Sequence, residues 1–260
     1  MGRCRSDTII AHNMVKLATQ ISLCISAVIT IAAAGELGNE PATALEVAHG
    51  VRPQPVVQDM HGWTVHVDPR LLDGKESTEG KRALSMLANH LERVSLLLTG
   101  QQLKDMRKLE LWIERDHPTL TNMQYHPSAA WLRNHDCDVR LAKKVHIPIA
   151  RQLLSREQLL KHPAVVLHEL AHAYHDQVLG FDDERVFNAF KEARDSEVYK
   201  HTMSHRGKTV RHYALSSHKE YFAEGTEAFL YRNDFYPFVR AELKQADAKL
   251  HEVLVEIWER

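Results

Sequence analysis

The apolar residues of this chain change their spacing about halfway along it. Between residues 63 and 149 they alternate with polar residues in three short segments, the pattern of half-buried β-strands: 63–67, 109–114 and 145–149. Farther along they recur at steps of three and four, which predicts helices over about 164–178, 183–195, 217–231 and 238–258. One earlier helix is predicted over 84–98. Strands followed by helices predict a single α+β domain with a mostly helical C-terminal half.

The third predicted strand contains Pro148. A proline has no backbone N–H to donate to a neighbouring strand, so we expect this strand to lie at the edge of a small mixed sheet. The segment 143–150 also precedes the helix predicted over 164–178. An exposed edge can bind an extended peptide through main-chain hydrogen bonds, so we expect this segment to border a cleft.

The first 34 residues have the composition of an export signal. Arg3, Arg5 and Lys16 precede an almost uninterrupted apolar run over 17–34, which ends in three alanines. The export machinery recognises a basic start, an apolar run and a small-residue cleavage site, so we expect 1–34 to be a cleaved signal peptide. The alternative is an uncleaved membrane anchor that tethers the protein through 17–34. Both place the rest of the chain outside the cytoplasm, as a secreted, periplasmic or extracellular protein.

The segment 35–60 contains three prolines and three glycines without a sustained apolar period, which predicts a linker. The folded domain is therefore expected over 61–260. Only Cys137 lies beyond the leader, so the domain has no intrachain disulfide and depends on its apolar core. The 33 Lys and Arg nearly balance the 34 Asp and Glu, and a net charge of −1 provides no field that would attract nucleic acid.

The helix predicted over 164–178 carries the sequence His168-Glu169-Leu170-Ala171-His172. Residues four apart share a helix face, so the imidazoles of His168 and His172 can reach one metal ion while Glu169 serves beside them as a base. This H-E-x-x-H pattern is typical of zinc hydrolases. Because the chain contains 18 histidines, the pattern needs the support of a third protein ligand.

Candidates for a third metal ligand lie downstream of the two histidines. The metzincin pattern is excluded, because its ligand and glycine positions hold Val178 and His175. Glu220 and Glu224 instead stand one turn apart in the helix predicted over 217–231. Glu220 can bind the metal, while Glu224 can accept a hydrogen bond from a ligand histidine and so fix its orientation. Two alternatives stay open: Glu220 as part of a capping box with Ser217, and Glu224 as the ligand.

This pair of glutamates, 48 residues after His172, resembles the second motif of the gluzincin metallopeptidases. The run from Glu220 to Glu224, with Tyr213 seven residues before it, is most similar to the catalytic domain of the anthrax lethal factor family, over about 160–232. The resemblance implies a zincin-like fold whose edge strand lies over the cleft. It also implies Zn²⁺ bound by His168, His172 and Glu220, with Glu169 as general base and Tyr213 as hydrogen-bond donor to the oxyanion. Tyr213 as a core residue, with His212 or His218 in that role, stays open.

Together these residues predict a secreted or membrane-tethered zinc metallopeptidase that acts on a peptide or protein substrate. An alternative from another class is a non-catalytic secreted binding protein in which zinc clamps two helices. Such a site would be closed by a fourth protein ligand, for which His175 and Glu224 are the candidates. A third reading is a zinc amidase that acts on a non-protein amide such as a cell-wall linkage.

Overall fold

The structure, a computed structural model, describes residues 53–260. The expected leader over 1–34 and the first part of the expected linker, 35–52, lie outside the described residues. The linker expected over 35–60 ends before Val56, because Val56–Met60 forms strand β1, which pairs antiparallel with β2 (Trp63–Val67). Gly62, with a φ of +90°, takes the left-handed conformation that the tight turn between these two strands requires.

The five-stranded sheet is mixed, with the order β1-β2-β3-β5-β4. The three strands that the alternating segments predict are present as β2, β3 (Glu110–Ile113) and β5 (Lys144–Ile147), and they run parallel. The expected edge position of β5 is wrong. Pro148 follows the last residue of β5 and removes no bond from it, so β4 (Gln124–Tyr125) pairs antiparallel with β5 and forms the edge.

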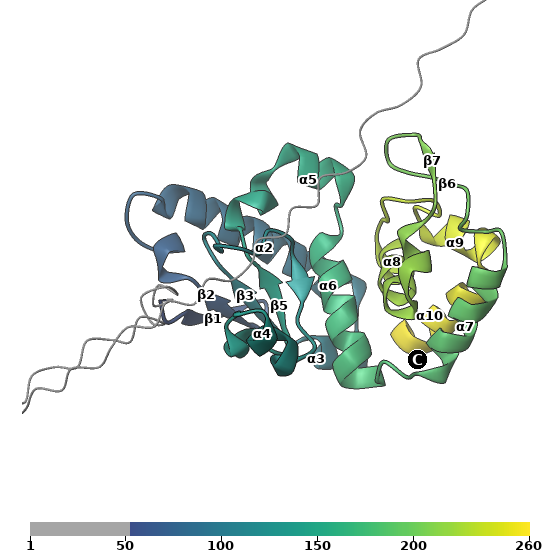
Figure 1. The fold of residues 1–260 in the computed structure, drawn as a ribbon, viewed down its shortest axis with the longest axis horizontal. Coiled ribbons are helices and arrows are strands. Elements are labelled where there is room, and N and C mark those ends of the chain that lie inside the picture. Colours follow the sequence, from purple (N-terminus) through teal and green to yellow (C-terminus); the bar gives the residue numbers. More distant parts are fainter. Residues whose placement is uncertain (1–52) are drawn as a thin grey trace, which may run out of the picture. The chain divides into compact units, whose positions relative to one another are not determined.

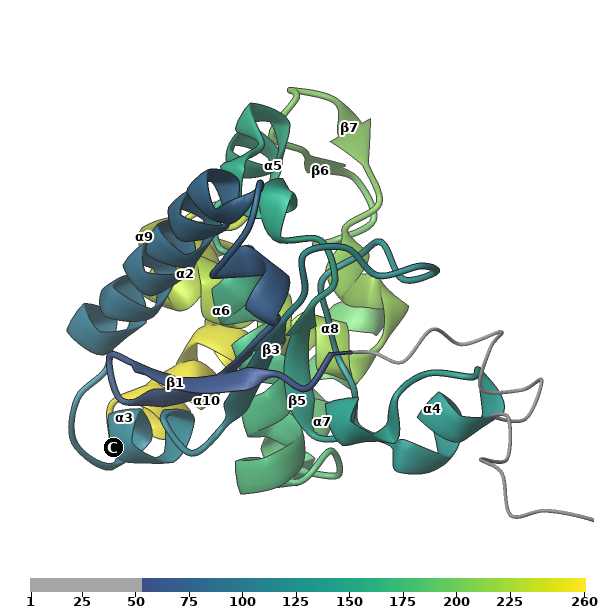
Figure 2. The ribbon, with the colours of Figure 1, turned by 90° about the vertical axis from the view of Figure 1, so that its left-hand side faces the viewer.

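The alternating side chains of the sheet pack on two different layers. Val65, Leu111 and Ile113 are fully buried against α2 (Ser77–Leu97), the helix predicted over 84–98, whose apolar stripe includes Leu87 and Leu91. On the opposite face, Trp112 packs with α4 (Ala129–Asn134) and the short helix η2 (Val139–Leu141) in a smaller cluster that also holds Cys137. Figure 2 shows α2 and α4 on different sides of the strands.

Four further short helices lie between the strands or between β5 and α6. They are η1 (Pro69–Leu71), α3 (Gly100–Met106), η3 (Ala150–Leu154) and α5 (Arg156–Lys161). The main chain of Met106 in α3 accepts a hydrogen bond of 2.9 Å from the buried indole of Trp63. This bond satisfies the only polar atom of a side chain that the core otherwise surrounds.

The C-terminal half is helical, as the three- and four-residue spacing predicts. Its elements are α6 (Val165–Tyr174), the π-helical turn η4 (His175–Leu179), α7 (Glu184–Asp195), the hairpin β6 (Thr202–Met203) and β7 (Thr209–Val210), η5 (Tyr213–Ser216), α8 (His218–Leu230), α9 (Arg240–Ala246) and α10 (Ala248–Trp258). The single helix expected over 238–258 is therefore two. The carboxylate of Asp247 accepts from the N–H of Leu250 and caps α10, which ends α9.

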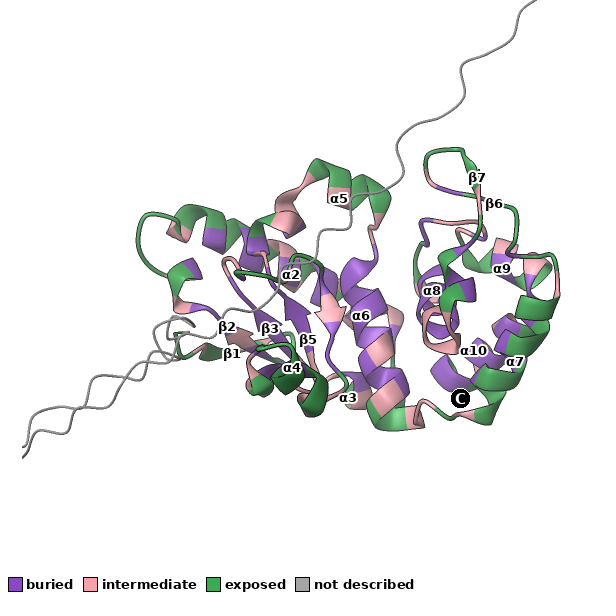
Figure 3. Cartoon of the chain, in the orientation of Figure 1, coloured by how far each residue is buried: buried purple, intermediate pink, exposed green. Residues whose placement is uncertain are grey.

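Helix α6 runs between the sheet and the remaining helices of the C-terminal half (Figure 1). It is buried on nearly all sides, as is α8, whereas α4 and α5 are largely exposed (Figure 3). None of the helices within 53–260 has both the length and the apolar character of a membrane-spanning segment. The fold is thus α+β, and its two most buried helices are the ones that carry the sequence motifs.

Candidate metal centre

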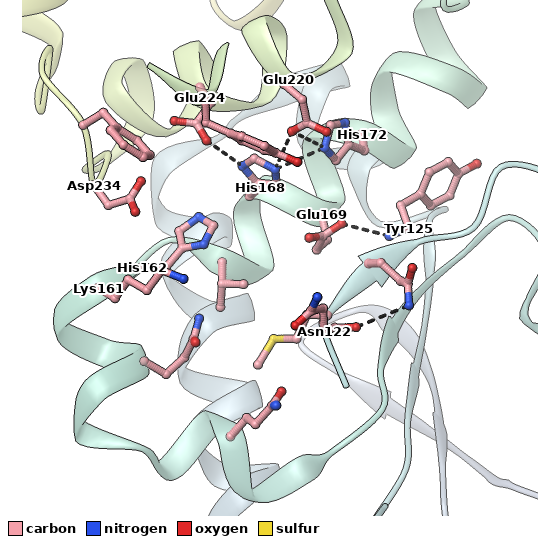
Figure 4. A pocket seen from close by; sticks show the side chains of 17 residues that line it. Asn122, Tyr125, Lys161, His162, His168, Glu169, His172, Glu220, Glu224 and Asp234 are labelled. Carbon is pink, nitrogen blue, oxygen red and sulfur yellow. Dashed lines mark hydrogen bonds and ion pairs between the residues drawn. The ribbon is translucent and has the colours of Figure 1, made fainter. Parts of the chain in front are cut away.

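His168, His172 and Glu220 meet where α6 and α8 face each other. The two histidines are one turn apart on α6, and Glu220 lies in the first turn of α8, where Ser217 caps the helix by accepting from the N–H of Glu220. The carboxylate of Glu220 is not used in a capping box, because it points at the two imidazoles (Figure 4). The Nε2 atoms of the histidines are 3.1 Å apart, and each is 3.2 Å from Oε2 of Glu220.

This nearly equilateral triangle of donor atoms fits a metal ion. Around a tetrahedral zinc ion with bonds of about 2.0 Å, neighbouring donors lie about 3.3 Å apart. The observed separations of 3.1 and 3.2 Å are within a few tenths of an ångström of this value. Two imidazole nitrogens and a carboxylate oxygen are also ligand types that zinc accepts in proteins. The three residues are therefore geometrically and chemically able to hold a divalent metal ion.

Behind the triangle, Glu227 fixes the orientation of His168. Its Oε1 lies 2.6 Å from Nδ1 of His168 and 2.9 Å from Nε2 of His162, and its side chain is fully buried. Burial would raise the pKa of Glu227, but the charges and hydrogen bonds of the two histidines outweigh it and lower the pKa to about 2. An ionised Glu227 accepts a hydrogen bond from the Nδ1–H group of His168. The lone pair on Nε2 of His168 then stays available to a metal ion.

Glu224, which the motif predicts to accept from a ligand histidine, does not do so. Its nearest carboxylate oxygen is 3.9 Å from Nδ1 of His168, which is beyond hydrogen-bonding distance. Burial and the negative charge of Glu227 raise the pKa of Glu224 well above its usual value. Glu220, Glu224 and Glu227 share one helix face at steps of four and three. This spacing is the sequence feature that could have identified Glu227 as the partner of His168.

A second set of potential metal ligands, His162, His168 and Glu227, lies beside the first. Its donor atoms are separated by 2.6 and 2.9 Å, which are hydrogen-bond lengths and shorter than the separation of about 3.3 Å between donors around one ion. We therefore interpret this set as a hydrogen-bonded support for the first.

Glu169 lies beside the donor triangle, and its carboxylate faces the cleft (Figure 4). Its Oε2 accepts a hydrogen bond of 2.8 Å from the backbone N–H of Tyr125 on the edge strand β4. Burial raises the pKa of Glu169, although the neighbouring charges of His168 and His172 oppose this shift. A carboxylate with a raised pKa is better suited to exchange protons near neutral pH.

The edge strand is tied to η4, the turn that follows α6, by residues that the sequence patterns did not single out. The hydroxyl of Tyr125 donates to Asp176 at 2.5 Å, and Nζ of Lys143 pairs with the same carboxylate oxygen at 2.5 Å. The side-chain amide of Gln177 donates to the carbonyl of Lys143 at 3.1 Å. These bonds hold β4 above α6, so the N–H of Tyr125 stays directed at Glu169.

Tyr213 lines the same cleft as Glu220, and its side chain is 48% exposed. Partial burial and the nearby charge of Glu220 raise the pKa of its hydroxyl, which therefore keeps its proton and can donate it in a hydrogen bond. The two histidines considered for the same role are engaged elsewhere. Nδ1 of His212 accepts from the N–H of Ala214, and Nε2 of His218 lies 2.8 Å from the carbonyl oxygen of Phe181.

No fourth protein donor joins the triangle among residues 53–260. His175 is fully buried and packs against the rings of Phe181 and Phe222, away from the donor atoms. Glu224 approaches His168 only at the nitrogen that faces Glu227. The open side of the triangle faces a cleft of about 570 Å³ that α5, α6, α8 and the segment around β4 enclose.

No protein-family model, curated protein or solved structure matches this chain. The resemblance to gluzincins therefore depends on the motif residues and on the geometry of the centre that they form.

Proposed function

We propose that this protein is a zinc-dependent metallopeptidase of gluzincin type that acts outside the cytoplasm. The observation that carries the proposal is the donor triangle of His168, His172 and Glu220, which opens into a cleft with Glu169 at its side. The mixed sheet, with an antiparallel edge strand above the helix of the two histidines, is the arrangement that a zincin-like fold implies.

The side chains around the triangle support hydrolysis of an amide. His168, His172 and Glu220 would hold the zinc ion, which would lower the pKa of a water molecule toward about 7 and polarise the scissile carbonyl group. Glu169 takes the proton from the attacking water and transfers it to the leaving amine. The hydroxyl of Tyr213 donates a hydrogen bond to the oxygen on which negative charge develops, so it stabilises the transition state more than the ground state.

The edge strand β4 supports a peptide as the substrate. Strand β4 pairs with β5 along one edge. Its two residues, Gln124 and Tyr125, also line the cleft. Because Glu169 already accepts from the N–H of Tyr125, an extended peptide would add to this edge through its other main-chain groups. We therefore propose 124–125 as the peptide-binding edge, whereas the sequence favoured 143–150.

The same geometry disfavours only one of the two alternatives, the structural zinc site. A structural zinc site is closed by four protein ligands, whereas three converge here among the described residues and the open side faces the cleft. An amidase that acts on a non-protein amide would use the same centre, so the substrate has to distinguish it from a peptidase.

Metal analysis and proteolysis assays on the exported part of the chain test the proposal. We expect one zinc ion per chain and chelator-sensitive cleavage of a broad peptide library. Glu169→Gln should keep zinc and lose cleavage, because it removes the base but no ligand. Glu220→Ala should lose zinc on dialysis. Undiminished turnover by Glu169→Gln, or cleavage of non-protein amides alone, would contradict the proposed peptidase.

A further inference from the structure

One wall of the cleft carries a positive charge that the proposed reaction does not use. Among the described residues that line the cleft, Lys161, at the C-terminal end of α5, is the only lysine or arginine. None of the residues between 53 and 260 forms a hydrogen bond or ion pair with its ammonium group. Other cations nearby are paired, such as Lys143 with Asp176 and Arg206 with Glu157. Lys161 is therefore free to bind an anion.

His162 lies next to Lys161 on the same wall and is held in a fixed position. Its Nε2 is 2.9 Å from the buried carboxylate of Glu227, and its ring packs edge-on against that of His168 with centroids 5.2 Å apart. The side chain is only 17% exposed, and both residues reach into the cleft (Figure 4). A group that enters this part of the cleft therefore meets a mobile ammonium group and a preoriented imidazole.

The carboxyl groups of the cleft leave this wall available to an anion. Glu220 is engaged by the two histidines of α6, Glu169 accepts from the N–H of Tyr125, and Glu224 is buried beside His168. The remaining carboxyl group in the cleft is that of Asp234. Burial raises the pKa of Asp234 to about 6. Asp234 lies close to His162 (Figure 4), and its carboxyl group offsets part of the positive charge of the wall at neutral pH.

We propose that Lys161 and His162 form a subsite for an acidic side chain of the peptide substrate, close to the scissile bond. The inference rests on the proposed peptidase function and adds the class of substrate. Opposite charges in a partly solvated cleft favour binding modestly, so we expect glutamate to be preferred over glutamine about five- to tenfold at one position.

Matched peptides test this subsite. In a quenched fluorescent series, each position on either side of the scissile bond carries Glu, Gln or Lys in turn, and kcat/KM is measured with the zinc-loaded protein. We expect one position to prefer Glu. Lys161→Met should abolish the preference and Lys161→Glu should reverse it in favour of Lys. Asp234→Asn should strengthen it, because it removes the opposing charge. Lys249→Met, on the exposed side of α10, serves as the control and should leave the preference unchanged.

The outcomes separate this inference from the proposed function. Equal kcat/KM for the Glu and Gln peptides at every position would overturn the subsite and leave the peptidase intact. If no peptide is cleaved, the proposed function fails. In that event, binding of the Glu and Gln peptides to the Glu169→Gln variant, measured by fluorescence anisotropy, still tests the subsite. Binding of the Glu peptide about five- to tenfold more tightly supports it, and equal affinity overturns it.

Discussion

Two helix interfaces of this domain differ in what they bury. Where α2 covers the sheet, the contact is apolar, with Leu87, Leu91 and Leu111 fully buried. Where α6 meets α8, the buried side chains include Glu169, Glu227 and other ionisable groups. Apolar burial stabilises the first interface by about 1.5–3 kcal/mol per large side chain. Buried ionisable groups stabilise a fold weakly at best, so the second interface contributes less to stability than the first.

The largest expected effect breaks the apolar interface without affecting the metal centre. Leu91→Ala leaves a cavity between α2 and the sheet, which should lower the free energy of unfolding by about 2–5 kcal/mol. Denaturant unfolding of the chelator-treated protein measures this loss. Zinc affinity of the folded variant should be unchanged. A parallel loss of zinc affinity would show that the two interfaces are not independent.

The next effect distinguishes two glutamates within the polar interface. Glu227→Gln removes the ionised acceptor of His168 and should weaken zinc binding about 10- to 100-fold. Glu224→Gln replaces a carboxyl group whose nearest oxygen is 3.9 Å from Nδ1 of His168, and it should change zinc affinity much less. Competition with a chromophoric chelator measures both affinities. A larger loss for Glu224→Gln would reverse the assignment made from the geometry.

Acid should destabilise the domain through histidines that are buried in the neutral form. Burial lowers the pKa of His126 to about 3, with the charges of His146 and His117 adding to the shift. Because the unfolded state binds the proton more tightly, stability is full above a pH of about 6.5 and falls as the pH decreases toward 3. At pH 5.5 this one histidine should lower stability by about 1.4 kcal/mol.

The metal-free protein isolates this effect, because acid also releases metal from histidine ligands. Denaturant unfolding between pH 7.5 and 5.0 should show the decline, and His126→Gln should reduce its slope. An identical slope in the two proteins would exclude His126 as a source of the acid sensitivity.

The smallest effect concerns the tie between β4 and η4. Tyr125→Phe removes the hydroxyl bound to Asp176 but keeps the backbone N–H that faces Glu169. It should cost about 1 kcal/mol of stability. We also expect kcat/KM for peptides to fall, since the edge strand above Glu169 loosens. Tyr231→Phe, at a partly exposed tyrosine on Arg93, is the matched control. Equal kcat/KM for both variants would show that the hydrogen bond between Tyr125 and Asp176 does not affect catalysis.

The sequence predicted the elements that local periodicity defines. Alternation over 63–67 and 109–114 predicted two of the parallel strands, and the four-residue step from His168 to His172 predicted a shared helix face. The structure brings these two histidines and Glu220 together. This succeeded because the geometry of a single helix fixes which residues share a face.

The remaining features depend on contacts between distant segments. Strand β4 has two residues, too few for any period, and is held by bonds from Tyr125 to Glu169 and Asp176. The interval of four residues from Glu220 to Glu224 matched a motif, but the approach of α8 to α6 directs Glu227 to His168 instead. The break at Asp247 follows from its bonds to Tyr221 and to the N–H of Leu250, which an uninterrupted apolar stripe does not reveal.

Diffraction from zinc-soaked crystals at the zinc absorption edge tests the central claim most directly. We expect one strong anomalous peak within about 2.1 Å of Nε2 of His168, Nε2 of His172 and a carboxylate oxygen of Glu220, with a non-protein ligand on the cleft side. A peak bound by His162 and Glu227, or one with a fourth protein ligand that closes the site, would contradict an open catalytic centre.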